Sequence, residues 1–475
     1  MSVMYKFFEL FTNNILTQPH FFIGLLVFIG YALLKRPLYE SFAGFIKAAV
    51  GYLILGVGAG GLVVTFRPIL AGLNGRFNLN AAVIDPYFGL NAANSAIESI
   101  GSTTSYMMIA LLVGFGWNML LVLFRKYTKV RTLCITGHIM IQQAATITWL
   151  VFLSFPQFRN MQGVILTGLL IGTYWAVFTN LTVEPVKDLT DGCGGFAVGH
   201  QQMFGVWLVD KLAPKIGNKD KSIDNLELPG WLAIFNDNVV ATGTLMLVFF
   251  GTLMVILGAP YLREIDPSFK VSTAFPTYII TKSLKFAVYL QILMLGVRMF
   301  VAELTESFQG ISETVLPGSV PAIDCAAVYS FSSPNTILFG FIFGLIGQLI
   351  AIAGLLVFKS PIMIITGFVP VFFDNATLAV FANKKGGIKA AAVLTFCSGI
   401  IQVLGGAFAA AYFKLYKFGG WHGNFDFDTL WPVIGVAINK LALPGVFITI
   451  VLMLVIPHLQ YRRDTNKEEY FEVIA

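Results

Sequence analysis

Long continuous apolar runs are the feature that most constrains this chain. Each run is close to the roughly 20 residues that a helix needs to cross the hydrocarbon core of a bilayer. Only 12% of the 475 residues are charged, about half the share that is typical of soluble domains. The runs do not alternate between apolar and polar residues, as the strands of a transmembrane barrel would. The sequence therefore predicts an all-α polytopic membrane protein.

The apolar runs predict about eleven transmembrane helices, near residues 20–34, 42–66, 104–124, 139–155, 163–183, 237–259, 282–301, 336–358, 361–382, 388–412 and 436–457. An odd number of spans places the two ends of the chain on opposite sides of the membrane. Lys and Arg favour short cytoplasmic loops, and they gather at 33–37, 124–131, 382–387 and 460–467. We therefore expect a periplasmic N-terminus and a cytoplasmic C-terminus.

An internal repeat relates the two halves of the chain. The stretch AAVIDPYFGLNAANSAI (81–97) resembles PAIDCAAVYSFSSPNTI (321–337), and ITGHIMIQQAAT (135–146) resembles ITGFVPVFFDNAT (365–377). Two matched pairs in the same order predict two inverted repeats with broken or re-entrant helices, as in many transporters. We divide the chain into an N-terminal membrane half, 1–235, with a cytoplasmic linker, and a C-terminal half, 236–475, with the last span.

His138 and Gln142 lie in an apolar run and are four residues apart, so they share one face of a helix. An imidazole and an amide offer the donors and acceptors that bind a ligand rich in hydroxyl groups. The alternative is a hydrogen bond between helices, a role that suits Gln143, which lies about 100° further around the helix. Polar groups at membrane depth usually mark a substrate path.

His200 and Gln201 follow the glycine-rich stretch DGCGGFAVG (191–199), where glycines allow tight turns and close approach of the backbone to a ligand. The alternative is a cytoplasmic loop that turns into an interfacial helix. His and Gln occur together in both places, which favours one shared pocket.

Asp324 is an acid in an apolar stretch, AIDCAAVYS, where an unpaired carboxylate is costly. It could accept hydrogen bonds from ligand hydroxyls, carry a proton, or pair with Arg298. Its repeat mate Asp85 directly precedes Pro86 and Tyr87. That order is typical of a helix start, and Tyr87 adds a hydroxyl and an aromatic ring.

Several classes of function find no support in the sequence. No phosphate-binding loop, dinucleotide fingerprint or catalytic triad motif is present, and the four Cys show no CxxC spacing of a metal site. The net charge of +6 is spread over short loops, so it does not indicate nucleic-acid binding. Arg298, Glu303 and Glu306 at the end of a span are better structural ion partners than catalytic carboxylates. We expect neither an enzyme nor a cofactor.

Four long motifs together resemble one family: TGHIMIQQA, TDGCGGFAVGHQQ, GVRMFVAELTESFQGIS and AIDCAAVYS. They are similar to the ascorbate-specific IIC component of the bacterial phosphotransferase system (PTS). The resemblance implies a single EIIC-type domain, a homodimeric inner-membrane permease with a V-shaped dimerisation region and a core region that carries L-ascorbate. Carried over by motif, the ligand-contacting residues are Pro86, Tyr87, His138, Gln142, His200, Gln201 and Asp324.

The resemblance also implies the mechanism. The core carries the bound sugar acid inward, and a separate IIB protein, supplied by IIA, phosphorylates it from its own cysteine. The alternative is a proton- or sodium-coupled secondary transporter that uses Asp324 or His138 as its coupling site. A membrane-embedded enzyme is a further alternative, against which the missing catalytic constellation counts.

Overall fold

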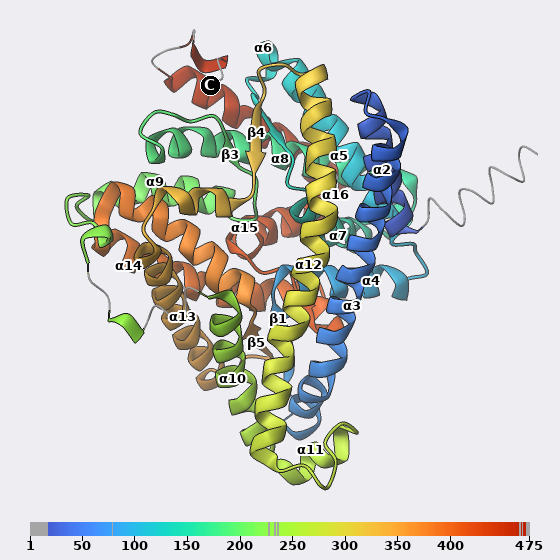
Figure 1. Ribbon diagram of the computed structural model, residues 1–475, viewed down its shortest axis with the longest axis vertical. Coiled ribbons are helices and arrows are strands. Elements are labelled where there is room, and N and C mark those ends of the chain that lie inside the picture. The colour runs from blue at the N-terminus through green and yellow to red at the C-terminus, as the bar shows by residue number, and fades with distance from the viewer. Residues whose placement is uncertain are drawn as a thin grey trace, which may run out of the picture.

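The computed structural model describes residues 18–77, 79–226, 229–231, 234, 237–464, 467 and 469–471, and it is mostly helical (Figure 1). Its helices are α2 (Pro19–Leu33), α3 (Leu38–Phe77), α4 (Pro86–Ser99), α5 (Ser105–Leu123), α6 (Arg125–Thr128), α7 (Gly137–Ser154), α8 (Met161–Leu189), α9 (Met203–Ile216), α10 (Asn238–Leu257), α11 (Ala259–Ile265), α12 (Phe275–Val315), α13 (Pro334–Val357), α14 (Asn375–Tyr412), α15 (Phe425–Asp428) and α16 (Leu430–Arg463). The predicted boundary between the two halves, at residues 235 and 236, lies outside the described residues.

Two long helices, α3 and α12, run side by side along one flank of the molecule (Figure 1). They are antiparallel, because Lys47 is bonded to Glu303 while Gly61, further along α3, packs against Tyr289, earlier in α12. Helices α2 and α10 pack on this pair. We call these four helices and α11 the long-helix region, and we call α4, α5, α7–α9 and α13–α16 the compact region.

Six short strands form two parallel sheets among the described residues, which corrects the prediction of an all-α protein. They are β1 (Asn80–Ile84), β2 (Thr132–Cys134), β3 (Ala197–Val198), β4 (Val320–Ile323), β5 (Ile362–Thr366) and β6 (Gly420–Trp421). The sheets have the orders β5-β1-β6 and β2-β4-β3. The physical reason is backbone pairing: where a helix breaks inside the protein, its exposed N–H and C=O groups need partners that lipid cannot supply.

The two sheets are built reciprocally from the two repeats. In the sheet β5-β1-β6, the central strand β1 begins the first copy of the repeat, and both of its neighbours come from the second half of the chain. In the sheet β2-β4-β3, the central strand β4 begins the second copy, and both of its neighbours come from the first half of the chain. The repeat found in the sequence is therefore also a repeat of structure, in which each half completes the sheet of the other.

Six helices in the described part of the chain are long and apolar enough to cross a membrane, and α10 with α11 makes a seventh if that pair, bent by 95°, is one span. The chain is thus a polytopic membrane protein with a broken or re-entrant helix pair, while the count of eleven spans stays a prediction. The span expected at 361–382 begins instead as strand β5. The expected gap between 382 and 388 is a break inside α14 at Gly387, whose φ is 63°.

Helix α7 is enclosed by protein, with fifteen of its residues buried. It packs against α4, α5 and α8, so its polar side chains face other protein groups rather than lipid. In contrast, Glu303 and Glu306 lie on the long helix α12, where Glu303 pairs with Lys47 at 3.0 Å and Glu306 pairs with Arg36. The structural role predicted for these two acids is confirmed.

Candidate functional site

Three of the predicted site residues converge where the strands of one sheet end. Asp324 directly follows β4, and His200 comes two residues after β3. His138 is the second residue of α7 and comes four residues after β2. The strands are parallel and adjacent, so their carboxyl ends meet at one edge of the sheet. This topology explains why residues up to 186 positions apart in sequence lie together.

These three side chains form a cluster, which we call the open cluster. The Nε2 atom of His138 lies 3.1 Å from Oδ2 of Asp324, and the two imidazole rings of His138 and His200 stand 6.4 Å apart between centroids. About two fifths of the Asp324 side chain is exposed, whereas His200 is 3% exposed. The pairing of Asp324 is with His138, not with Arg298, the partner considered from the sequence.

Some polar atoms of the open cluster already have hydrogen-bond partners in the protein, and others do not. Ala326 donates its backbone N–H to Oδ1 of Asp324 at 2.8 Å, and Nδ1 of His200 is 2.5 Å from the amide oxygen of Gln202. Among the described residues, Nδ1 of His138 has no hydrogen-bond partner although it is buried. A buried nitrogen without a partner is costly, so a ligand hydroxyl that reaches it gains a hydrogen bond.

The open cluster also has the composition of a cation site. One ligand atom from each of His138, His200 and Asp324 lies within 4.8 Å of the other two, and two imidazoles with a carboxylate suit a divalent transition metal. The same atoms suit a polyhydroxylated ligand equally well, because imidazole and carboxylate groups hydrogen bond to hydroxyls.

Beside the open cluster, a row of buried amides continues the predicted site. Gln201 donates its amide to Oε1 of Gln142 at 2.5 Å, and Gln142 is in turn hydrogen bonded to the hydroxyl of Tyr87. The structure therefore brings together the His and Gln pairs of both sequence motifs. Gln143 does not join them: it accepts from Trp175 on α8 and donates to the carbonyl of His200, which confirms its predicted role between helices.

Tyr87 lies in the first turn of α4, where Asp85 caps the helix by accepting from the Tyr87 backbone N–H at 3.0 Å. Pro86 occupies the first helical position and is buried, a place where the missing N–H of proline costs nothing. The helix start predicted for Asp85 is confirmed. Tyr87 is held so that its hydroxyl meets Gln142.

Two residues of this polar interior escaped the sequence analysis. His422 follows β6, and its ring nitrogens lie 2.6 Å from Oε1 of Gln201 and 2.7 Å from the hydroxyl of Thr146. A third matched pair could have revealed it, since VGHQQMF after β3 and WHGNFDF at β6 both place a histidine just past a strand. Thr146 carried no signal in the sequence, because a threonine in a helix usually bonds to the turn before it.

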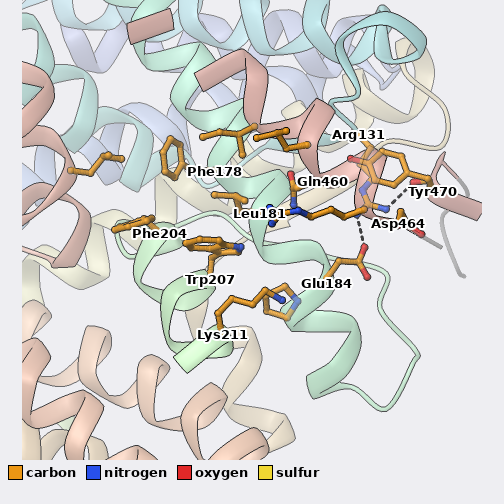
Figure 2. Close-up of a pocket in the computed structure, with 15 residues that line it drawn as sticks. Arg131, Phe178, Leu181, Glu184, Phe204, Trp207, Lys211, Gln460, Asp464 and Tyr470 are labelled. Carbon is orange, nitrogen blue, oxygen red and sulfur yellow. Dashed lines mark hydrogen bonds and ion pairs between the residues drawn. The ribbon is translucent and has the colours of Figure 1, made fainter. Parts of the chain in front are cut away.

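A cavity in the described part of the chain lies away from these residues. It has a volume of about 630 Å³ and lies between α8, α9, α16 and the C-terminal turn that contains Tyr470 (Figure 2). Its walls are mostly apolar, and at one end Arg131 donates to Glu184 at 2.6 Å and to the Tyr470 carbonyl at 2.8 Å. None of the predicted site residues lines this cavity.

The fold and these side chains define a class: a polytopic helical membrane protein whose polar groups gather inside it, at the strand ends between its two repeats. Residues 14–431 match the family model EIIC-GAT, the PTS system sugar-specific permease component. The chain is also 33% identical over 442 residues to the ascorbate-specific PTS system EIIC component of Mycoplasma pneumoniae, covering 84% of this chain and 66% of that protein. It thus spans slightly less than two thirds of that relative's length.

The family match covers most of the chain, so the protein belongs to the EIIC-GAT family of PTS permease components. This confirms the resemblance found in the four motifs. Membership makes the chain a permease component of this family and places it in the cell membrane.

Proposed function

We propose that the protein binds L-ascorbate at the open cluster and the adjoining amides and carries it across the bacterial inner membrane, coupled to phosphorylation by a separate IIB protein. The observation that carries this proposal is the convergence of His138, His200 and Asp324 at one sheet edge. The relative in Mycoplasma pneumoniae supports the choice of ascorbate, since it bears that name and shares 33% of aligned residues.

The chemistry of the side chains fits an anion rich in hydroxyl groups. Gln142, Gln201, Tyr87 and the two histidines supply donors and acceptors without a fixed positive charge, so they hold an anion without trapping it. Asp324 accepts from a ligand hydroxyl and faces away from the anionic edge, because like charges repel. Pro86 contributes by fixing the start of α4 beside Tyr87.

The proposal includes the architecture that the family implies. Eleven spans in two inverted halves, 1–235 and 236–475, would place the N-terminus in the periplasm and the C-terminus in the cytoplasm. The reciprocal sheets and the antiparallel packing of α3 and α12 support an inverted repeat. We assign the long-helix region to the V-shaped dimer contact of a homodimer and the compact region to the moving core.

The partner in this proposal is a IIB protein that carries phosphate on a cysteine and is itself phosphorylated by IIA. The basic segment at 124–131 offers a surface for an acidic face of IIB. The basic segment at 382–387 lies within α14, where Lys384 and Lys385 already pair with Asp191, Asp188 and Asp210. Phosphorylation adds charge to ascorbate after it arrives, and the charged product does not return.

Uptake of labelled ascorbate into vesicles that contain the protein tests the proposal. With phosphorylated IIB inside the vesicles, we expect ascorbate phosphate to accumulate; without IIB, we expect no accumulation against a gradient. Free ascorbate that accumulates without IIB and is lost with an uncoupler would instead identify a proton-coupled secondary transporter. Turnover of ascorbate in detergent without any partner would identify an enzyme.

A further inference from the structure

His422 is an entirely buried histidine that no motif of the resemblance includes. It lies one residue past β6, and its ring stacks on Phe427 with 3.7 Å between centroids. Its two nitrogens reach Gln201 at 2.6 Å and Thr146 at 2.7 Å. An imidazole with both nitrogens engaged inside a membrane protein holds one proton between two partners, and which nitrogen carries it has consequences for its neighbours.

A continuous chain of hydrogen bonds leads from His422 to the predicted site. Its links are His422 to Gln201, Gln201 to Gln142 at 2.5 Å, and Gln142 to the hydroxyl of Tyr87. Gln142 and Gln201 are at most 2% exposed, so water does not substitute for a missing partner. Each amide has a donor at one corner and an acceptor at the other, so the orientation of one amide fixes that of the next.

The proton of His422 therefore sets the direction of the whole chain. With the proton on Nε2, His422 donates to the oxygen of Gln201, Gln201 donates to Gln142, and Gln142 donates to the Tyr87 oxygen. The Tyr87 hydrogen is then free to point at a ligand. In this arrangement the hydroxyl of Thr146 donates to Nδ1 of His422 across the 2.7 Å contact.

With the proton on Nδ1, every link reverses. Thr146 accepts from His422 and gives its own hydrogen to the Gln142 carbonyl, which lies 3.2 Å away. Gln201 then donates to His422, Gln142 donates to Gln201, and Tyr87 donates to Gln142. The Tyr87 hydroxyl now offers only lone pairs to a ligand.

We propose that His422 is a positioning residue whose proton location decides whether Tyr87 meets the ligand as a hydrogen-bond donor or as an acceptor. An anionic oxygen requires a donor, so the bound state of an acid such as ascorbate selects the form with the proton on Nε2. A neutral polyol, in contrast, is accepted by either form. His422 thus contributes to selectivity for an anion without touching it. This inference rests on the ligand site proposed above.

A double-mutant cycle tests the coupling, with binding of labelled ascorbate measured on the purified full chain in detergent. Loss of one buried hydrogen bond predicts that His422→Phe and Tyr87→Phe each weaken binding by about 5- to 10-fold. Both substitutions act on the same ligand contact, so their effects on affinity should not add. We expect the dissociation constant of the double variant to be at most about twofold higher than that of the single variant that binds ascorbate more weakly. A loss of affinity in the double variant equal to the product of the two single losses would overturn the proposal.

Matched controls separate this role from a structural one. Gln348 is a buried amide bonded to Gln402 and outside the chain of hydrogen bonds. We therefore expect Gln348→Leu to change ascorbate affinity by the same factor in the Tyr87→Phe variant as in the unmodified protein. His422→Gln, which retains a donor and an acceptor, is expected to bind within about threefold of the unmodified protein. No recovery in His422→Gln, with thermal stability unchanged, would also overturn the proposal.

Nitrogen-15 spectra of labelled histidine provide a readout that needs no variant. We expect the His422 signals of the ascorbate-bound protein to show a protonated Nε2 and a bare Nδ1, and the opposite assignment would contradict the proposal. If the unmodified protein binds no ascorbate at all, the proposed function fails. If it binds ascorbate but the cycle is additive, only the role of His422 fails.

Discussion

The carboxyl ends of the two sheets present clusters that share a backbone plan and differ in character. In the open cluster, Asp324 follows the central strand β4 and His138 follows the neighbouring strand β2. At the matched places of the other sheet, Asp85 follows β1 and Phe368 follows β5. We call Asp85, Phe368 and His422 the closed cluster, because Asp85 is 1% exposed and Phe368 is fully buried.

The difference comes from how each carboxylate is satisfied. Asp85 accepts from two backbone N–H groups, of Tyr87 at 3.0 Å and of Val369 at 3.2 Å. Asp324 accepts one backbone N–H, of Ala326, and turns its other oxygen to His138. With phenylalanine in place of histidine, the carboxylate serves only to tie two elements together. With histidine, the same position leaves polar atoms open to a ligand.

Asp85→Ala is expected to have the largest effect. It leaves the N–H groups of Tyr87 and Val369 buried without acceptors, at a cost of about 3 kcal/mol in the free energy of unfolding. Denaturant or thermal unfolding in detergent measures this loss. Asp85→Asn retains an oxygen and serves as the control, with a smaller loss. An Asp85→Ala variant as stable as the unmodified protein would remove the distinction between the two clusters.

Asp324→Ala should reverse the pattern, affecting binding more than stability. Loss of a hydrogen bond to a charged group costs about 2 kcal/mol, or about a 30-fold weaker affinity for ascorbate. The midpoint of unfolding is expected to move little, because the side chain is partly exposed. Equilibrium binding and unfolding on the same preparation check both halves of this prediction. Unchanged affinity would mean that the open cluster does not hold the ligand.

His138→Phe gives the open cluster the residue that the closed cluster has at the matched position, Phe368. Asp324 then loses its imidazole partner, and the ligand loses one neutral hydrogen bond, which predicts about a fivefold weaker affinity, or about 1 kcal/mol. The same binding assay measures the change, with His20→Phe as a control for removal of an imidazole elsewhere. An affinity equal to that of the unmodified protein would show that the histidine is not what distinguishes the clusters.

Lys47→Ala lies outside both clusters and should have the smallest effect. Its partner Glu303 keeps a hydrogen bond from Tyr31 at 2.7 Å, and the Lys47 side chain is largely exposed. Exposed ion pairs contribute little, so we expect a loss of at most about 0.5 kcal/mol in stability. Ascorbate affinity should not change. A clear loss of affinity would extend the site to the long-helix region.

Much of the architecture follows from the amino-acid sequence alone. Apolar runs and the scarcity of charge predict the class, since only buried or lipid-facing helices tolerate such composition. The repeat aligns Asp85 with Asp324, and the strands that precede them confirm that match. The six short strands were not predicted, because runs such as IMIIT and NAAVI are as apolar as the helices that follow them.

The sequence by itself determined that this chain spans a membrane, repeats itself and carries histidines and amides where lipid would penalise them. Those properties follow from local composition and spacing. Only the tertiary structure decided which of the repeated carboxylates is open, because Asp85 accepts the backbone N–H of Val369 from the other half of the chain, whereas about two fifths of the Asp324 side chain stays exposed. It also decided that His422 belongs with Gln201, a contact across 221 residues that arises from strand pairing between the two halves and leaves no periodic trace in either.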